Sequence, residues 1–153
     1  LTRAEARDFI DKYFKTFSGV AKWIEQTKIE AREQGYVSTL FGRRRNIPEI
    51  NSGVSQVRAA AERVAVNLPV QGTAADLIKM AMIKVDEKLF ATSAKSRMLL
   101  QVHDELVFEV PVGDVDKVAK MVKHEMEAAV TLDVPIVAEV KVGENWGEMS
   151  VVR

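Results

Sequence analysis

The residues best suited to chemistry in this sequence are the consecutive His103, Asp104 and Glu105. The apolar runs on either side are each long enough for a buried strand, so residues 97–111 predict a β-hairpin with these polar residues at its turn. Charged groups between apolar strands are costly unless something binds them. Because carboxylate oxygens are the preferred ligands of Mg²⁺, the pattern indicates a divalent-metal site, with a plain polar turn as the alternative.

A second group consists of Arg43, Arg44 and Arg45, which follow Gly42. Arginines that project from a glycine turn can bind backbone phosphates without reading the base sequence, and such binding is sensitive to salt. Taken by itself, the segment could also be a solvated basic loop or a targeting-type basic patch.

A third group lies around Pro69, where Asn67 and Gln71 flank the proline. Carboxamides suit the minor groove, because purine N3 and pyrimidine O2 present similar acceptors in every base pair. These side chains could instead satisfy backbone groups freed at a helix break, and both interpretations stay open.

Helices must position most of these residues. Apolar residues at helical spacing predict helices from about Arg3, which follows a capping box, and over about 20–34, 54–68, 73–90 and 115–130. Pro69 is expected to end or kink the third of these helices, and a new capping pattern at Thr73 to begin the fourth. Residues 36–41 and 136–142 predict strands, the first of them in a short hairpin or extended loop. The sequence therefore predicts a helix-rich α+β fold with a small antiparallel sheet.

Composition narrows the class of protein. The 153 residues fit one domain, and the lack of cysteine excludes disulfides and thiolate metal sites and suggests a cytoplasmic location. No apolar run approaches the ~20 residues of a membrane span, and no signal peptide is visible. The net charge is zero, yet residues 43–66 carry a balance of +3 and residues 109–148 a balance of −5. One face could therefore meet phosphate.

The motifs together resemble those of the family A DNA polymerases, the bacterial DNA polymerase I type. The string at 101–107 closely resembles motif C of that family, and the strings at 39–45, 60–76 and 142–146 resemble other family signatures. The resemblance covers essentially the whole chain. One departure is Asn46, where the family usually has an aromatic residue.

The resemblance implies roles for individual residues. Asp104 would bind both Mg²⁺ ions of a catalytic pair, Glu105 would support it near the metals, and His103 would lie near the primer terminus. The other residues would contact primer–template DNA, namely Arg43, Arg44, Arg45, Arg63, Asn67 and Gln71. The implied substrate is a dNTP.

Two landmarks of the family are missing from the sequence: the second metal-binding aspartate and the fingers helix that holds the incoming nucleotide. We therefore expect a C-terminal fragment that is inactive alone and needs an N-terminal polymerase portion. Residues 1–91 would form a mainly helical fingers and palm region with a DNA-binding loop at 36–48, and residues 92–153 the palm hairpin, a helix and a last strand. A non-catalytic DNA-binding subunit derived from a polymerase is the alternative. A metal-dependent phosphohydrolase is disfavoured, because His103 and His124 are the only histidines.

Overall fold

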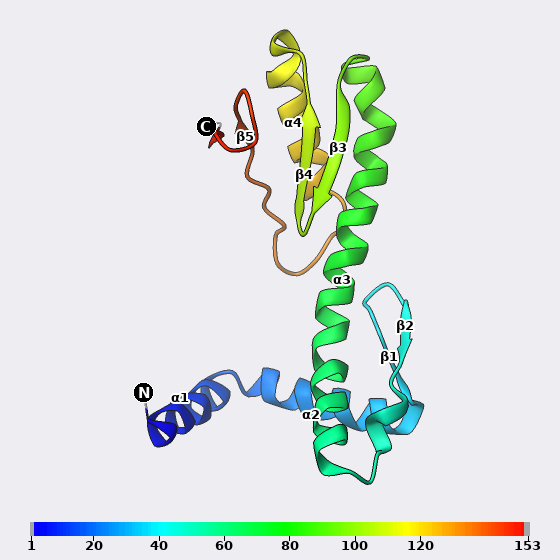
Figure 1. Ribbon diagram of the computed structural model, residues 1–153, viewed down its shortest axis with the longest axis vertical. Helices are drawn as coiled ribbons and strands as arrows, with labels where there is room; N and C mark the ends of the chain where they lie inside the picture. Colours follow the sequence, from blue (N-terminus) through cyan, green and yellow to red (C-terminus); the bar gives the residue numbers. More distant parts are fainter. Residues whose placement is uncertain (1, 152–153) are drawn as a thin grey trace. The chain divides into compact units, whose positions relative to one another are not determined.

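The computed structural model describes residues 2–151. These residues form four α-helices and three two-stranded antiparallel sheets (Figure 1), which confirms the predicted helix-rich α+β class. The chain divides into two compact units, Leu1–Thr73 and Ala74–Arg153. Within the described residues, no helix is both long and apolar enough to cross a membrane.

The first unit opens with two helices whose ends follow local signals. Helix α1 (Arg3–Thr16) begins at the predicted capping box, where the Glu5 amide donates to Thr2 Oγ1 at 3.3 Å and the Thr2 amide donates to Glu5 Oε2 at 2.7 Å. Helix α2 (Ser18–Gln34) ends at Gly35, whose φ of +75° is the left-handed conformation favoured by glycine.

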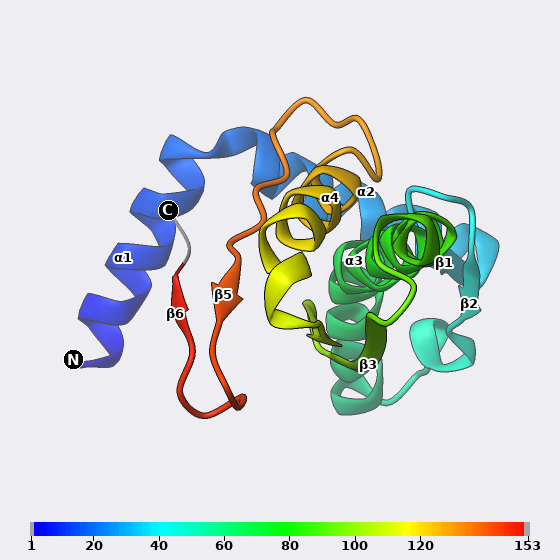
Figure 2. The same ribbon diagram turned by 90° about the horizontal axis from the view of Figure 1, so that it is seen from above.

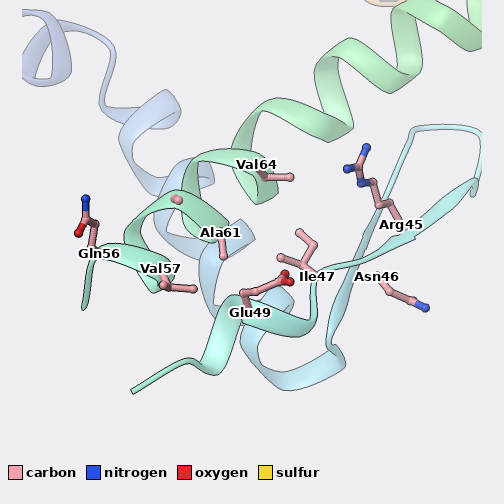
Figure 3. Close-up of a pocket in the computed structure, with 9 residues that line it drawn as sticks. Arg45, Asn46, Ile47, Glu49, Gln56, Val57, Ala61 and Val64 are labelled. Carbon is pink, nitrogen blue, oxygen red and sulfur yellow. The ribbon is translucent and has the colours of Figure 1, made fainter. Parts of the chain in front are cut away.

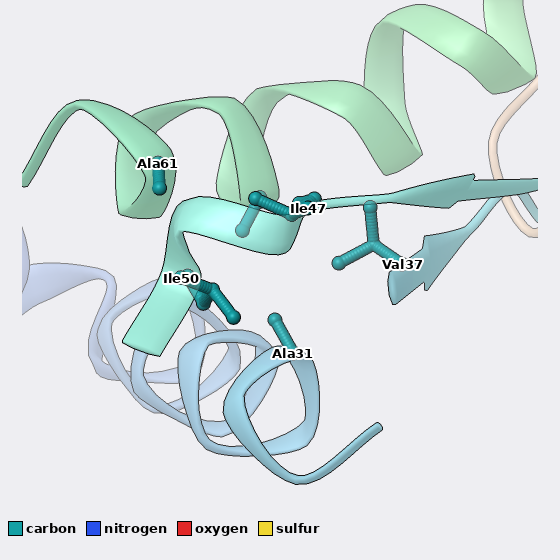
Figure 4. Close-up of a cluster of buried hydrophobic side chains, with 6 residues drawn as sticks. Ala31, Val37, Ile47, Ile50 and Ala61 are labelled. Atoms are coloured by element: carbon teal, nitrogen blue, oxygen red, sulfur yellow. The ribbon is translucent and has the colours of Figure 1, made fainter. Parts of the chain in front are cut away.

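A short hairpin and a small core complete this unit. Strand β1 (Tyr36–Ser38) pairs antiparallel with β2 (Arg44–Asn46), and a 3-10 helix, η1 (Pro48–Asn51), follows. Figure 4 shows the buried side chains that α2, β1, the η1 region and α3 (Ser55–Thr92) contribute to one cluster: Ala31, Val37, Ile47, Ile50, Ala61 and Ala65. This packing holds the hairpin against the helices.

Helix α3 corrects one expectation. Separate helices over 54–68 and from Thr73 were predicted, but α3 runs from Ser55 to Thr92 with Pro69 inside it. An interior proline costs about 3 kcal/mol, because a helical hydrogen bond is lost. Buried positions recur at helical spacing on each side of the proline, at Ala61 and Ala65 before it and at Ile78 and Val85 after it. Burying a side chain as large as that of Ile78 or Val85 is worth about 1.5–3 kcal/mol, and such packing offsets the free-energy cost of the proline.

The second unit contains the predicted acidic hairpin. Strand β3 (Arg97–Val102) pairs antiparallel with β4 (Glu105–Glu109), with a register irregularity between Met98 and Leu100. A 3-10 helix, η2 (Val112–Asp114), leads into helix α4 (Val115–Glu127). The core joins the C-terminal half of α3, the hairpin and α4 through Val85, Leu89, Val118 and Val122, with Met98, Phe108, Val110, Met121 and Met126 packed around them.

The last predicted strand is much shorter than expected. Residues 136–142 were predicted as a strand, but only β5 (Lys141–Val142) pairs, with β6 (Ser150–Val151), in the short hairpin that Figure 2 shows. The backbone at Ala138 has side-chain partners in place of a neighbouring strand. Its amide donates to Glu127 Oε1 at 3.0 Å, and its carbonyl accepts from Lys123 Nζ. The alternating burial at 136–140 that resembles a strand therefore comes from an extended segment attached to α4.

Candidate metal and nucleic-acid site

The tip of the β3–β4 hairpin presents the predicted metal-binding residues. Val102 pairs with Glu105, so only His103 and Asp104 connect the two strands, and Glu105 is already the first residue of β4. His103, Asp104 and Glu105 are all exposed. His103 has a φ of +55°, and the carbonyl of this residue accepts a hydrogen bond from Gln101 Nε2. Few non-glycine residues adopt this backbone conformation, and His is among those enriched in it.

The hairpin depends on the helices beneath it. A two-stranded hairpin alone is marginally stable in water, so the packing of Met98 and Phe108 on the core is what holds it. Polar contacts tie α3 to α4 in the same unit. Lys84 Nζ donates to the carbonyls of Ala128 and Ala129 at 3.0 Å each, and Lys88 Nζ lies 2.6 Å from Glu125 Oε1. These contacts join the two helices on which the hairpin packs, while the residues of the tip are exposed.

Several carboxylates in the molecule have shifted pKa values, and their causes are structural. The hydrogen bond from Lys88 lowers the pKa of Glu125, and the hydrogen bond from Lys123 lowers that of Glu127. Lys117, followed by Ser93, lowers the pKa of Asp114. These acids therefore serve as partners of lysines in unit 2, and we do not assign them to chemistry.

The donor set at the hairpin tip suits part of a magnesium site. Within residues 2–151, no cluster of three or more His, Cys, Asp or Glu side chains is placed to hold a metal ion. Mg²⁺ usually takes one or two carboxylates together with waters and substrate phosphates. The exposed carboxylates of Asp104 and Glu105 fit such a partial role.

The arginine loop, defined as residues 39–45, is tightly turned. Gly42 has a φ of +81°, and its amide donates to the Thr39 carbonyl at 2.9 Å. The three arginines lie in different surroundings. Arg43 Nη2 donates to the Gly72 carbonyl at 3.0 Å, the Arg44 guanidinium lies 4.6 Å from the centre of the Tyr36 ring, and Arg45 pairs with Val37 across the hairpin.

Three predicted DNA-contacting residues share one exposed face of α3. Arg63, Asn67 and Gln71 follow each other at intervals of four residues, which places them along one side of a helix. All three are exposed. Arg63 and Asn67 also line an open pocket of about 420 Å³ between α2 and α3. Glu62, beside this face, pairs with Arg32 of α2 at 2.6 Å, and the hydrogen bond from Arg32 lowers the pKa of Glu62.

A second open pocket of about 420 Å³ lies beside the arginine loop (Figure 3). Ile47 and apolar side chains of α3 make much of its wall, and Arg45, Glu49 and Gln56 add polar groups. Asn46, the residue that departs from the family pattern, lines this pocket as well. The predicted residues of the loop and of α3 thus belong to unit 1, and those of the hairpin tip belong to unit 2.

Sequence reasoning missed the residues that hold the arginine loop in place, Thr39, Gly72 and Thr73. The Leu40 amide donates to Thr73 Oγ1 at 2.9 Å, so Thr73 is a loop partner inside α3 and does not cap a new helix. The available signal was the pair of small residues directly after Gln71, which permits a close approach of backbone.

Comparisons with known proteins agree with these motifs. The profile of DNA polymerase family A matches residues 1–148. The thermostable DNA polymerase I of Thermus caldophilus is 54% identical over 142 residues, covering 93% of this chain and 17% of that protein. DNA polymerase I of Streptococcus pneumoniae TIGR4 is 47% identical over 148 residues, covering 97% of this chain and 17% of that protein. The chain thus spans about a sixth of the length of these curated relatives.

A solved structure is similar as well. The POL domain of Pol1 from M. smegmatis, in complex with DNA primer-template and dNTP, matches with a TM-score of 0.84 and 47% identity. The match covers 88% of this chain and 24% of that one. With the family profile matching nearly every residue, the chain belongs to the family A DNA polymerases.

Proposed function

We propose that this chain supplies part of the active site and part of the DNA-contacting surface of a template-directed DNA polymerase, which adds nucleotides from dNTPs to a primer 3′-hydroxyl. The observation that carries the proposal is the hairpin tip, where Asp104 is one of the two residues between the paired strands and is exposed. An exposed carboxylate on a packed hairpin is well placed to bind a metal ion with fixed geometry.

In this proposal Asp104 binds Mg²⁺, Glu105 supports it from the start of β4, and His103 lies near the primer terminus. When bound, a pair of Mg²⁺ ions activates the attacking hydroxyl and stabilises the leaving pyrophosphate. The chain's own contribution is to hold the carboxylates in place. The hairpin does so through its turn and through the packing of Met98 and Phe108.

The DNA contacts in this proposal come from unit 1. Arginines of the loop bind backbone phosphates, and Arg63, Asn67 and Gln71 lie along the duplex near the primer end. Their spacing of four residues supports the assignment, because one helix face can follow one groove.

A polymerase portion with a second metal-binding aspartate and a nucleotide-binding helix would complete the enzyme. We propose that residues 1–91 act as part of fingers and palm, that residues 92–153 act as part of the palm, and that the chain alone does not extend a primer. The support is the partial donor set, since the described residues offer no three-ligand metal cluster.

A chimera tests the proposal. This chain would replace the matching segment of the Thermus caldophilus polymerase, and primer extension would be measured with Mg²⁺ and four dNTPs. We expect an active chimera, an inactive isolated chain, and loss of activity in Asp104→Asn. The matched control is Asp116→Asn, which removes an exposed carboxylate from the first turn of α4 and should leave activity unchanged. Primer extension by the isolated chain, or an active Asp104→Asn chimera, would refute the assignment.

The alternative is a non-catalytic DNA-binding subunit. It is favoured by the arginine loop and the polar face of α3, which lie together in unit 1 and need no metal. An inactive but folded chimera, together with salt-sensitive DNA binding by the chain, would support this alternative.

A further inference from the structure

We propose that Arg43 is a positioning residue that fastens the arginine loop to α3 together with Thr39, Gly72 and Thr73, a group we name the loop anchor. In this inference Arg44 and Arg45 contact phosphate and Arg43 acts through the shape of the loop. The inference rests on the proposed DNA binding and divides the work among the three arginines.

The first support is a pair of hydrogen bonds between the loop and one turn of α3. The Leu40 amide donates to Thr73 Oγ1 at 2.9 Å, and Arg43 Nη2 donates to the Gly72 carbonyl at 3.0 Å. Both bonds lie within unit 1, where Figure 1 shows the loop between β1 and β2 beside α3. The loop is thus held at two points, on either side of its glycine turn.

The second support is the close approach at Gly72. A Cβ atom at this position would lie 2.7 Å from Thr39 Cγ2, which is closer than two carbon atoms can pack. Thr39 cannot easily yield, because it is 5% exposed and its Oγ1 accepts from the Arg43 amide at 3.2 Å. The Thr39 amide also donates to the Arg43 carbonyl at 2.9 Å. Only glycine lets the loop reach the helix here.

The third support is the difference among the arginines. Arg43 directs a donor to a helix carbonyl in its own chain, whereas Arg44 stacks on Tyr36 and Arg45 borders the open pocket. An arginine that is stacked on a ring keeps its guanidinium edge available for phosphate. A residue that acts through geometry should change affinity without changing the number of phosphate contacts.

Salt dependence measures that number directly. For duplex DNA, each phosphate contact contributes about 0.9 to the slope of log affinity against log salt concentration. The affinity of the purified chain for primer–template DNA would be measured at several salt concentrations between about 50 and 200 mM. We expect Arg44→Gln and Arg45→Gln each to reduce the slope by about 0.9. Arg43→Gln should leave the slope unchanged and weaken binding about fivefold at every salt concentration, the scale of ordering one surface segment on binding.

Variants of the helix side of the anchor keep all three arginines. Thr73→Val removes the acceptor for the Leu40 amide and should reproduce the uniform loss, while Thr73→Ser keeps the hydroxyl and should restore affinity. Gly72→Ala should displace the loop and act like Thr73→Val. The double variant Arg43→Gln with Thr73→Val should lose little more than either single variant, because both act on one anchor.

Hydrogen exchange at the Leu40 amide gives a measurement that needs no DNA. This amide should exchange faster in Thr73→Val and in Arg43→Gln than in the unmodified chain and in Thr73→Ser. A slope reduced by about 0.9 in Arg43→Gln, or unchanged Leu40 exchange in both variants, would overturn the anchor. If neither the unmodified chain nor any variant bound DNA, the proposed DNA contacts of unit 1 would be wrong. The Leu40 exchange rates would still decide whether the anchor exists.

Discussion

The backbone at His103 predicts an unusual order of stability for its glycine and alanine variants. Among the described non-glycine residues, only His103 has a positive φ, at +55°. We predict that His103→Gly is more stable than His103→Ala. Both variants remove the imidazole, so the comparison isolates the backbone. At an ordinary position the order is reversed, because glycine loses more conformational freedom on folding than alanine.

The magnitude follows from two opposing terms. The left-handed conformation costs a residue with a Cβ about 1–2 kcal/mol, and glycine avoids this cost. The greater freedom of glycine in the unfolded chain costs about 0.5–1 kcal/mol. The midpoints of these ranges leave His103→Gly ahead of His103→Ala by about 0.75 kcal/mol. For a chain of 153 residues, a difference of this size corresponds to roughly 3 °C in melting temperature.

Urea unfolding of the purified variants, followed by far-UV circular dichroism, would measure the difference. The matched control lies in the same turn, because Asp104 does not have a positive φ. There we expect Asp104→Ala to be at least as stable as Asp104→Gly. If His103→Ala proved more stable than His103→Gly, with equal dependence of the free energy on urea, the argument from backbone strain would be wrong.

Three further predictions concern the helices. The pKa of Glu125 lies below its ordinary value of 4.5, chiefly because of the hydrogen bond from Lys88, so the pair stabilises the fold at neutral pH and this contribution is lost as the pH falls below about 4.5. The fall in melting temperature between pH 7 and pH 3.5 should therefore be smaller in Glu125→Gln than in the unmodified chain, and an equal fall in both would contradict a stabilising role of the pair. Val85 is 0% exposed, so Val85→Ala should cost about 2–3 kcal/mol of unfolding free energy, whereas Val112→Ala, at a position 92% exposed, should stay within about 0.5 kcal/mol. Phe9 is 71% exposed on α1, and Phe9→Ser should reduce the fluorescence of a dye that binds apolar surface; unchanged dye fluorescence would exclude this helix as its site.

Local signals in the sequence predicted the elements that carry the candidate site. The capping box before α1, the end of α2 at residue 34 and the hairpin around Asp104 depend on residues a few positions apart, and the structure confirms each of them. The fold class was predictable for the same reason, since helical spacing and short apolar runs are local patterns.

Features that depend on distant partners were not predictable. Pro69 was expected to interrupt a helix, but the core clusters on both sides of the proline keep α3 continuous. Residues 136–140 alternate like a strand, yet their backbone is held by Lys123 and Glu127 of α4. The roles of Gly72 and Thr73 depend on a loop about thirty positions earlier in the chain, which no short window of sequence displays.

The distance in sequence between the arginine loop and its anchor has a consequence for the order of folding. The β3–β4 hairpin joins neighbouring residues, and contacts of that kind form early because little chain entropy is lost. The bond from Leu40 to Thr73 spans 33 residues, and its acceptor lies within α3. During synthesis the residues of the loop are joined to the chain before Thr73 has been added. The loop therefore reaches its final shape only after this turn of α3 has formed.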